Sequence, residues 1–520
     1  MATFFLHGYH LGVEDSEIYL PAIKKLIHPA LYPFAPEFFL SHGHLSLFSP
    51  VVAWTAMATG LSADWAILLW YVLTLYAMAI ACWMVAKACF ESTRARWGAV
   101  LLTMAVLTMP ATNTGLLLMD PYLTARSMST PLTLIALASL LERRFVRAGV
   151  AAALTATVHP QMAVYLLFLM GVILVHRRIR ARSLEPAPAM ASLALILPGG
   201  FHLGPATGPY REALFSRDYF FLSTWAWYHW LGMIGPLAIL GWFWRSRLRK
   251  TTDSFACLSF AMIPFGMLSI LAAGILSSST IFEMFVRLQP LRTFHLITLV
   301  LILLLGGVAG EFCTGKLRWA GIAALLAAAV GLGISDVMLY PASPHVEWPA
   351  KQSENAWINT LLWVRQNTPE NAVFAVDSRY FLEPGVDTHG FRSISERSAL
   401  ADYYKDSGVV SLFPALAPEW KQMTEATNGL NHFSLADFKR LETQYPAVSW
   451  TVINGTAPAG LVCPFVQGGY SVCKLPAEDA GRGSVSRSVS GLQSAPSSSQ
   501  NAPTARASAW GIPSFSGRIG

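Results

Sequence analysis

Three carboxylates lie within four consecutive positions near the start of the chain, at Glu14, Asp15 and Glu17. Carboxylates packed this closely raise one another's pKa or bind a cation. Either property suits acid–base chemistry, and Asp15 and Glu17 are the candidate ligands for a divalent cation. The same pattern is also typical of a solvated acidic loop at a membrane edge.

A second polar segment begins at Asp120 and ends at Arg126. These two residues either pair with each other or take part in a site. His159 lies between two short apolar runs, where a polar group is costly unless it has a partner. It is interpreted either as a site residue or as a core histidine at a helix break.

A third set, Arg287, Arg292 and His295, lies at the start of a long apolar run. Arginine at a membrane edge often only anchors to lipid headgroups. Its fork of donors also matches the oxygens of a lipid-linked phosphate. Together with His159, these residues are the candidate phosphate-binding group.

The composition indicates that these residues belong to a membrane protein. Hydrophobic residues make up 54% of the 520 residues and charged residues 13%, whereas soluble domains carry about 25% charged residues. The mean hydropathy of +0.45 indicates the same class. The net charge is +7, but the basic residues lie in short clusters between apolar runs, which argues against a nucleic-acid-binding surface.

About ten membrane-crossing helices are expected, since one span takes about 20 largely apolar residues. The longer apolar runs cover residues 65–86, 97–119, 225–244, 255–276, 291–310 and 319–339. Shorter runs cover 127–141, 148–158, 160–175 and 190–203. Two full spans do not fit between 148 and 175, so we expect two short helices bent at His159–Pro160. Residues 45–61 are expected to lie in the interface.

Clusters of arginine and lysine set the expected orientation, because such residues concentrate in cytoplasmic loops. The clusters are Arg94 and Arg96; Arg143, Arg144 and Arg147; Arg177, Arg178, Arg180 and Arg182; Arg245, Arg247, Arg249 and Lys250; Lys316 and Arg318. The segments 7–44 and 120–126, and everything after 340, are then external. The first loop, 7–44, is expected to hold a helix lying on the membrane surface. We also expect a first helix upstream of Met1.

The chain divides into a multi-pass membrane part at 1–340, a small extracytoplasmic α/β domain at 341–475 and a tail at 476–520 that is expected to be disordered. In the α/β domain we expect helices at 357–366 and 435–443, the second capped by Ser434, and strands at 372–376, 448–453 and 470–475. The charged residues Arg392, Arg397, Lys405 and Asp406 are interpreted as a solvated face. Cys463 and Cys473, on either side of Gly468-Gly469, are expected to form a disulfide.

The stretch Glu14-Asp15-Ser16-Glu17-Ile18-Tyr19 is similar to the acidic motif in the first external loop of the GT-C class of integral-membrane glycosyltransferases. Many helices follow, several of them short, and then an external α/β domain. The stretch Asn367-Thr368-Pro369, after a helix rich in tryptophan, also resembles the C-terminal domains of that class. The resemblance covers the architecture of residues 8–475 and implies a mostly helical, GT-C-like fold.

This resemblance implies an enzyme of the inner (cytoplasmic) membrane that transfers a hexosyl group from a polyprenyl-phosphate donor to an extracytoplasmic acceptor. Asp15, with Glu14 beside it, matches the carboxylate that acts as base or metal ligand in the class. Asp120 matches a second acidic residue in a later external loop. Arg292 and Arg287 would hold the departing phosphate. The implied partners are the donor and membrane lipids, with a divalent cation as candidate cofactor.

Two other functions stay open. A transporter or flippase would line a path with polar residues inside the membrane, although no internal repeat is visible. A non-catalytic polytopic membrane protein is the third candidate. Lipid-sugar-dependent turnover separates the enzyme from both.

The orientation is tested with reporter fusions. We expect fusions at Gly149 and Arg182 to report a cytoplasmic location and fusions at Pro344 and Gly468 an external one, because the basic clusters mark the cytoplasmic loops. A cytoplasmic C-terminal domain would contradict both the orientation and the glycosyltransferase interpretation.

Overall fold

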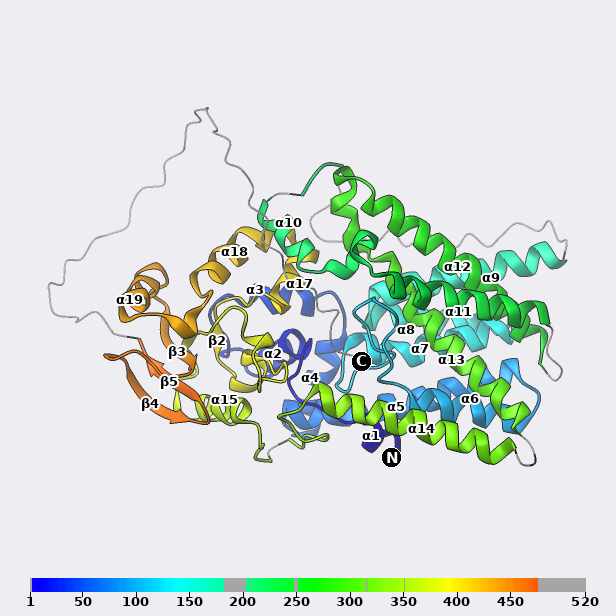
Figure 1. Cartoon of the computed structure of the whole chain (residues 1–520), viewed down its shortest axis with the longest axis horizontal. Coiled ribbons are helices and arrows are strands. Elements are labelled where there is room, and N and C mark those ends of the chain that lie inside the picture. The colour runs from blue at the N-terminus through cyan, green and yellow to red at the C-terminus, as the bar shows by residue number, and fades with distance from the viewer. Residues whose placement is uncertain are drawn as a thin grey trace. The chain divides into compact units, whose positions relative to one another are not determined.

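The computed structural model of the protein describes residues 2–181, 203–206, 208–246, 251–313, 315, 317–349 and 351–475. The chain is mostly helical and ends in a small five-stranded sheet (Figure 1). Within the described residues, five helical segments are long and apolar enough to cross a membrane. They are α5 (Ala63–Cys89), Pro160–Arg180 in α9 (Pro160–Ala181), α12 (Asp253–Ser277), Thr280–Phe312 ending in α13 (Thr293–Phe312), and α14 (Leu317–Leu339).

Other helices complete the bundle. They are α1 (Ala2–His7), α4 (Phe48–Thr59), α6 (Thr93–Ala105), α7 (Ala125–Leu141), α8 (Phe145–Val158) and α11 (Trp227–Ser246). The described residues thus contain five candidate spans, whereas about ten were predicted. Most of the predicted run 190–203 lies outside the described residues. The predicted bend at His159–Pro160 is confirmed, because α8 ends directly before this pair and α9 begins within it. The prediction of two short helices is wrong for α9, which has 22 residues and is a candidate span.

The predicted span over 97–119 is wrong, because α6 ends at Ala105. The chain then folds back on itself, and the backbone of 109–111 pairs with that of 116–118. Pro110 lies in this loop and has no amide N–H with which to continue a helix. The returning limb carries the Leu117 and Leu118 carbonyls toward the candidate site.

Glycines allow α6 and α13 to pack with their backbones in contact. A Cβ added at Gly98 would lie 2.4 Å from the carbonyl oxygen of Gly306, and one added at Gly310 would lie 2.6 Å from that of Arg94. Small residues four positions apart are typical of closely packed membrane helices. This contact fixes α13, whose first turn follows Arg292.

The helix ends that carry basic clusters, such as the ends of α9 and α11 and the start of α14, lie at the end of the bundle away from the sheet (Figure 1). Arg177, near the end of α9, donates to the carbonyls of Leu140 and Leu141 at the end of α7, at 2.8 and 2.9 Å. Arg180 lies 3.5 Å from Asp253 at the start of α12. The opposite end of the bundle carries the first loop and the sheet.

The sheet is a three-layer α/β unit with strand order β2-β1-β3-β5-β4. One face packs on α15 (Ala356–Asn367) and the other on helices that include α19 (Leu435–Gln444), which is capped by Ser434 as predicted. β1 is parallel to β2 and β3, while β5 is antiparallel to β3 and β4. The strands are β1 (Val373–Ala375), β2 (Ser398–Ala399), β3 (Val448–Asn454), β4 (Val462–Gln467) and β5 (Tyr470–Lys474).

The predicted disulfide between Cys463 and Cys473 is confirmed and ties β4 to β5. Gly468 and Gly469 make the turn between these strands, with φ of +62° and +86°. Positive φ at both central residues is the geometry of the favoured two-residue hairpin turn. Closing so short a loop stabilises the folded state by about 2–3 kcal/mol on the chain-entropy estimate.

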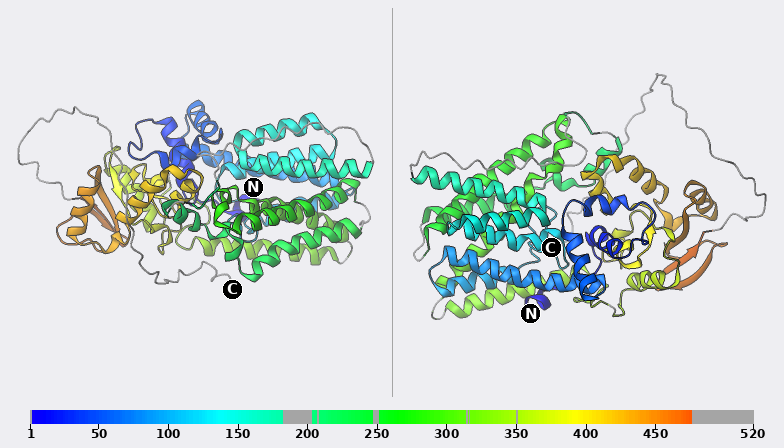
Figure 2. Two further views of the ribbon diagram at one scale, coloured as in Figure 1. Left: turned by 90° about the horizontal axis from the view of Figure 1, so that it is seen from above. Right: turned by 180° about the vertical axis from the view of Figure 1, so that it is seen from behind.

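The prediction that the first loop carries a helix lying on the membrane surface is wrong. Protein encloses this loop. Its helices are α2 (Ser16–Ile27) and α3 (Glu37–Gly43), and every residue from Ser16 to Lys24 is buried. In both views of Figure 2 these blue helices lie against the yellow and gold helices of the C-terminal part. Their contacts there are with α16 (Phe391–Ser395) and α17 (Lys405–Leu412).

Candidate active site

Backbone hydrogen bonds hold the acidic loop around Glu14 against residues 388–390 of the C-terminal part. The Glu14 amide donates to the Thr388 carbonyl at 2.9 Å, and the Gly390 amide donates to the Gly12 carbonyl at 2.8 Å. Asp15 comes directly before α2, but its side chain makes no capping hydrogen bond to that helix. The Asp15 side chain is instead 50% exposed, so its carboxylate is open to a ligand.

Lys405 neutralises part of this loop. Its ammonium donates to Asp15 Oδ1 at 3.1 Å and also to Glu14. Burial alone would raise the pKa of Asp15, but the charge and hydrogen bond of Lys405, together with the charges of Arg217 and Arg292, hold it well below its usual range. Asp15 is therefore ionised throughout the physiological range.

Glu17 belongs to a separate buried cluster. Arg392 Nε donates to Glu17 Oε1 at 2.9 Å, and the amides of Arg392 and Ser393 donate to the two carboxylate oxygens at 2.8 Å each. The other side of the same guanidinium contacts Asp406 at 2.7 Å and Asp402 at 3.3 Å. Burial raises the pKa of Glu17, while Arg392 opposes that rise. With both oxygens engaged, Glu17 does not join Asp15 as a metal ligand in this arrangement.

The interpretation of the charged stretch as a solvated face is wrong. Arg392, Arg397, Lys405 and Asp406 are all buried. Arg397 donates to the Thr368 carbonyl at 2.6 Å, and Asp406 pairs with Arg392. Arg392 and Lys405 form ion pairs with carboxylates of the first loop. The first-loop partners of Arg392 and Lys405 stand 375 and 391 positions earlier in the chain, so the local pattern of charge could not reveal them.

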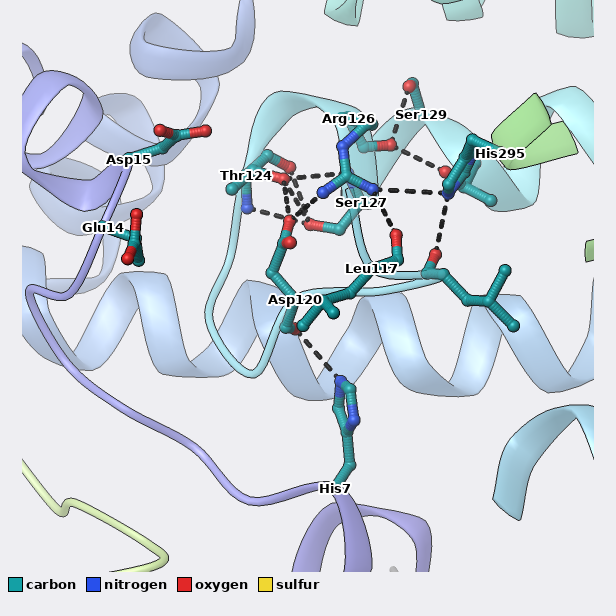
Figure 3. A network of polar contacts seen from close by, with 12 residues as sticks. His7, Glu14, Asp15, Leu117, Asp120, Thr124, Arg126, Ser127, Ser129 and His295 are labelled. Atoms are coloured by element: carbon teal, nitrogen blue, oxygen red, sulfur yellow. Dashed lines mark hydrogen bonds and ion pairs between the residues drawn. The ribbon is translucent and has the colours of Figure 1, made fainter. Parts of the chain in front are cut away.

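Asp120 and Arg126 pair with each other, which was one of the two predicted outcomes (Figure 3). Arg126 Nη2 donates to Asp120 Oδ2 at 2.5 Å, and Thr124 Oγ1 donates to the same oxygen at 3.2 Å. Arg126 Nη1 lies 3.3 Å from His295 Nε2, which in turn contacts the Leu118 carbonyl at 2.9 Å. Burial raises the pKa of Asp120 and the charge of Arg126 opposes it. Figure 3 shows Glu14 and Asp15 beside this network, on the side of Thr124.

Two arginines near Asp15 have spare donors. Arg292 Nη2 makes one long hydrogen bond, 3.4 Å, to the Tyr219 hydroxyl, and Arg217 Nη2 donates to the Tyr404 carbonyl. The Nε atoms of both arginines are buried and have no hydrogen-bond partner within the part of the chain that the structure describes. Buried donors are normally satisfied, so this pair is suited to an anionic ligand.

His42 of α3 is affected by charges of both signs. Its Nδ1 also has no partner among the described residues, and its ring meets the edge of Tyr19 at 5.2 Å between centroids. Burial lowers the pKa of His42, with the charges of Asp15 and Arg292 acting in opposite directions. The imidazole is thus neutral and able to accept a proton or a hydrogen bond.

The remaining predicted residues hold other positions. Arg287 is buried, and its Nη1 donates to the Leu412 carbonyl at 3.2 Å, which ties the membrane part to α17. His159 Nδ1 accepts from the Met162 amide at 3.2 Å and so caps α9, although the ring still lies in the field of Arg292. The structure thus brings together Asp15, Glu14 and Arg292, with the Asp120–Arg126–His295 network beside them.

Lys405, Arg217 and His42 are the site residues that sequence reasoning missed. Arg217 lies in a segment with no pattern of its own, and Lys405 was assigned to the solvated face. His42 follows apolar residues in the first loop and lacks any ligand spacing. Only the unusual density of charge around Lys405 could have drawn attention to it.

Comparison with known proteins adds nothing to this geometry, since neither a protein-family model nor a curated protein matches the chain.

Replacing Arg392 tests how strongly the first loop depends on the C-terminal part. We expect Arg392→Met to destabilise the protein by about 3–5 kcal/mol, because it leaves buried carboxylates without a counter-charge. Arg440→Met is the matched control: this arginine is 72% exposed and pairs with Asp437, so about 0–1 kcal/mol is expected. Thermal unfolding in detergent measures both, and equal effects would contradict the buried cluster.

Proposed function

We propose that the protein is an integral-membrane glycosyltransferase of the GT-C type, which moves a sugar from a polyprenyl-phosphate donor to an acceptor outside the cytoplasm. One observation carries the proposal. An ionised, half-exposed carboxylate, Asp15, shares its electrostatic environment with Arg217 and Arg292, whose buried donors lack partners among the described residues. Transfer from a lipid phosphate requires this combination of an acceptor-binding anion and phosphate-binding cations.

The balance of charge favours an anionic ligand. Glu14 and Asp15 face Lys405, Arg217 and Arg292. Two carboxylates against three cations leave one positive charge, which is the sign that attracts a phosphodiester. The Asp120–Arg126 pair beside them is neutral as a unit and leaves this balance unchanged.

In the proposed reaction the bond between the sugar C1 and the phosphate oxygen breaks as the bond between C1 and the acceptor oxygen forms. The polyprenyl phosphate leaves with one more negative charge, which the guanidinium groups of Arg217 and Arg292 stabilise. The acceptor hydroxyl donates a hydrogen bond to Asp15 and releases its proton to that carboxylate, or to the neutral His42. Because Lys405 makes Asp15 a weak base, the proton moves late, when positive charge has built up on the sugar.

The placement of the basic clusters supports the orientation. They lie at the end of the helical bundle away from the sheet, and arginine and lysine concentrate in cytoplasmic loops. We therefore propose a multi-pass protein of the inner membrane, with Asp15 and the α/β part on the extracytoplasmic side. A donor lipid would then reach the arginines sideways from the outer leaflet.

Donor consumption by the purified protein tests the proposal, with a panel of polyprenyl-phosphate sugars as substrates. Asp15→Asn should lower the rate about 10²–10⁴-fold, because it removes the group that orients and deprotonates the acceptor. Arg292→Ala should lower the rate by a similar factor, and Arg292→Lys should restore part of it. Asp253→Asn should leave the rate unchanged, since this aspartate is 92% exposed at the other end of the bundle.

Consumption that is equal in the wild type and in Asp15→Asn would remove catalysis from this carboxylate. If no donor of the panel is consumed, while labelled lipid crosses the bilayer of vesicles that hold the protein, the transporter or flippase interpretation would replace the enzyme.

A further inference from the structure

A second group of ligating side chains lies outside the candidate active site, at the end of α14. Asp336 projects from the last turns of this helix, His345 follows nine positions later, and His10 comes from the first loop. One nitrogen or oxygen of each residue lies within 4.8 Å of the others. Within the described residues, no other group of three or more histidine, cysteine or acidic side chains meets this criterion.

The distances fit a metal ion. His345 Nδ1 lies 3.1 Å from Asp336 Oδ2, and His10 Nε2 lies 3.8 Å from the same oxygen. In a tetrahedral zinc site with bonds of about 2.0–2.1 Å, neighbouring ligand atoms stand about 3.3 Å apart. An ion placed between these atoms therefore needs only small movements of the side chains.

The ligand atoms are buried, and Asp336 contacts the two histidines through ion pairs that require a protonated imidazole. Asp336 and His10 are each 1% exposed. Both oxygens of Asp336, both ring nitrogens of His10, and Nδ1 of His345 have no hydrogen-bond partner among the described residues. Leaving so many polar atoms unsatisfied is costly, and a cation at their centre would satisfy one atom of each residue at once.

Neighbouring groups already orient the ligands. His345 Nε2 lies 2.9 Å from the Phe5 carbonyl, a contact that places the proton on Nε2 and leaves the lone pair of Nδ1 facing Asp336. His10 stacks on Tyr340 with 3.9 Å between ring centroids. Its Nδ1 lies 3.7 Å from Glu347. Metal-bound histidines typically donate their other nitrogen to a carbonyl or a carboxylate, as His345 does to the Phe5 carbonyl, while His10 Nδ1 faces the Glu347 carboxylate without a hydrogen bond.

The backbone holds the two segments together at this point. The Tyr9 amide donates to the His345 carbonyl at 3.0 Å, and the Glu347 amide donates to the Tyr9 carbonyl at 2.8 Å. Gly8, with φ of +75°, passes so close that an added Cβ would lie 2.9 Å from Asp336 Oδ2. The surroundings of the three ligands are thus fixed before any ion binds.

We propose that His10, Asp336 and His345 bind a divalent transition-metal ion of the zinc class. Two imidazoles and one carboxylate are ligands that zinc prefers, and three protein ligands leave one position for water. The ion joins the first loop, α14 and the segment that leads to the sheet. Its ligand in the first loop, His10, lies four positions before Glu14. The ion thereby holds the acidic loop in place. This site stands whether or not the protein transfers sugars.

Metal binding by the full-length protein tests the inference. Protein stripped with a chelator and dialysed should take up one equivalent of zinc in competition with a chromophoric chelator. Asp336→Asn and His345→Gln should each weaken binding about 100-fold or more, because each removes a ligand. His432→Ala should bind as the wild type does, since this histidine is exposed and is not one of the three ligands.

A second measurement needs no variant. Zinc should raise the unfolding temperature of the stripped wild type in a concentration-dependent manner, because an ion that binds only the folded state stabilises it. Uptake of less than one equivalent by the wild type, or uptake that both Asp336→Asn and His345→Gln retain, would overturn the proposal and leave the group as an ion-pair network of Asp336 with protonated histidines.

Discussion

The position of the acidic loop depends on charges supplied by the opposite end of the chain. Lys405 pairs with Glu14 and Asp15, and Arg392 pairs with Glu17. Both cations lie in the α/β part, whereas all three carboxylates lie in the first loop. Without these pairs, three carboxylates within four positions would repel one another and remain in water. With them, α2 is enclosed by protein and Asp15 is left ionised at a half-exposed position.

Such buried ion pairs contribute little net stability, because desolvation offsets much of their attraction. Their effect here is to fix the position of the first loop. The Arg392 cluster holds the start of α2 against α16 and α17, while Arg287 ties the segment before α13 to the Leu412 carbonyl. Two parts of the chain are thereby held so that the charge of Arg292 helps to lower the pKa of Asp15. A site assembled from a loop and a helix start needs this support, since neither element could position the other alone.

The elements that could be predicted are those with a strong local pattern. The apolar run of α5 and the capping box of α19 are encoded in short stretches of sequence, and so is the Cys463–Cys473 hairpin with its two glycines. The end of α6 was missed, because residues 106–119 are apolar enough to imitate a helix, whereas the backbone reverses between Ala111 and Leu116. In the site, Asp15 and Arg292 were found from their residue types. Lys405 was not, because its partners lie 390 and 391 positions away.

The central claim is that Arg217 and Arg292 recognise the phosphate of a polyprenyl lipid beside Asp15. Native mass spectrometry of the purified protein with a polyprenyl monophosphate and the matching polyprenol measures this recognition without requiring the sugar or the acceptor. We expect the wild type to retain the phosphorylated lipid in preference to the alcohol, and the double variant Arg217→Ala, Arg292→Ala to lose that preference while remaining folded. Equal retention of the two lipids by the wild type, or an unchanged preference in the double variant, would contradict the claim.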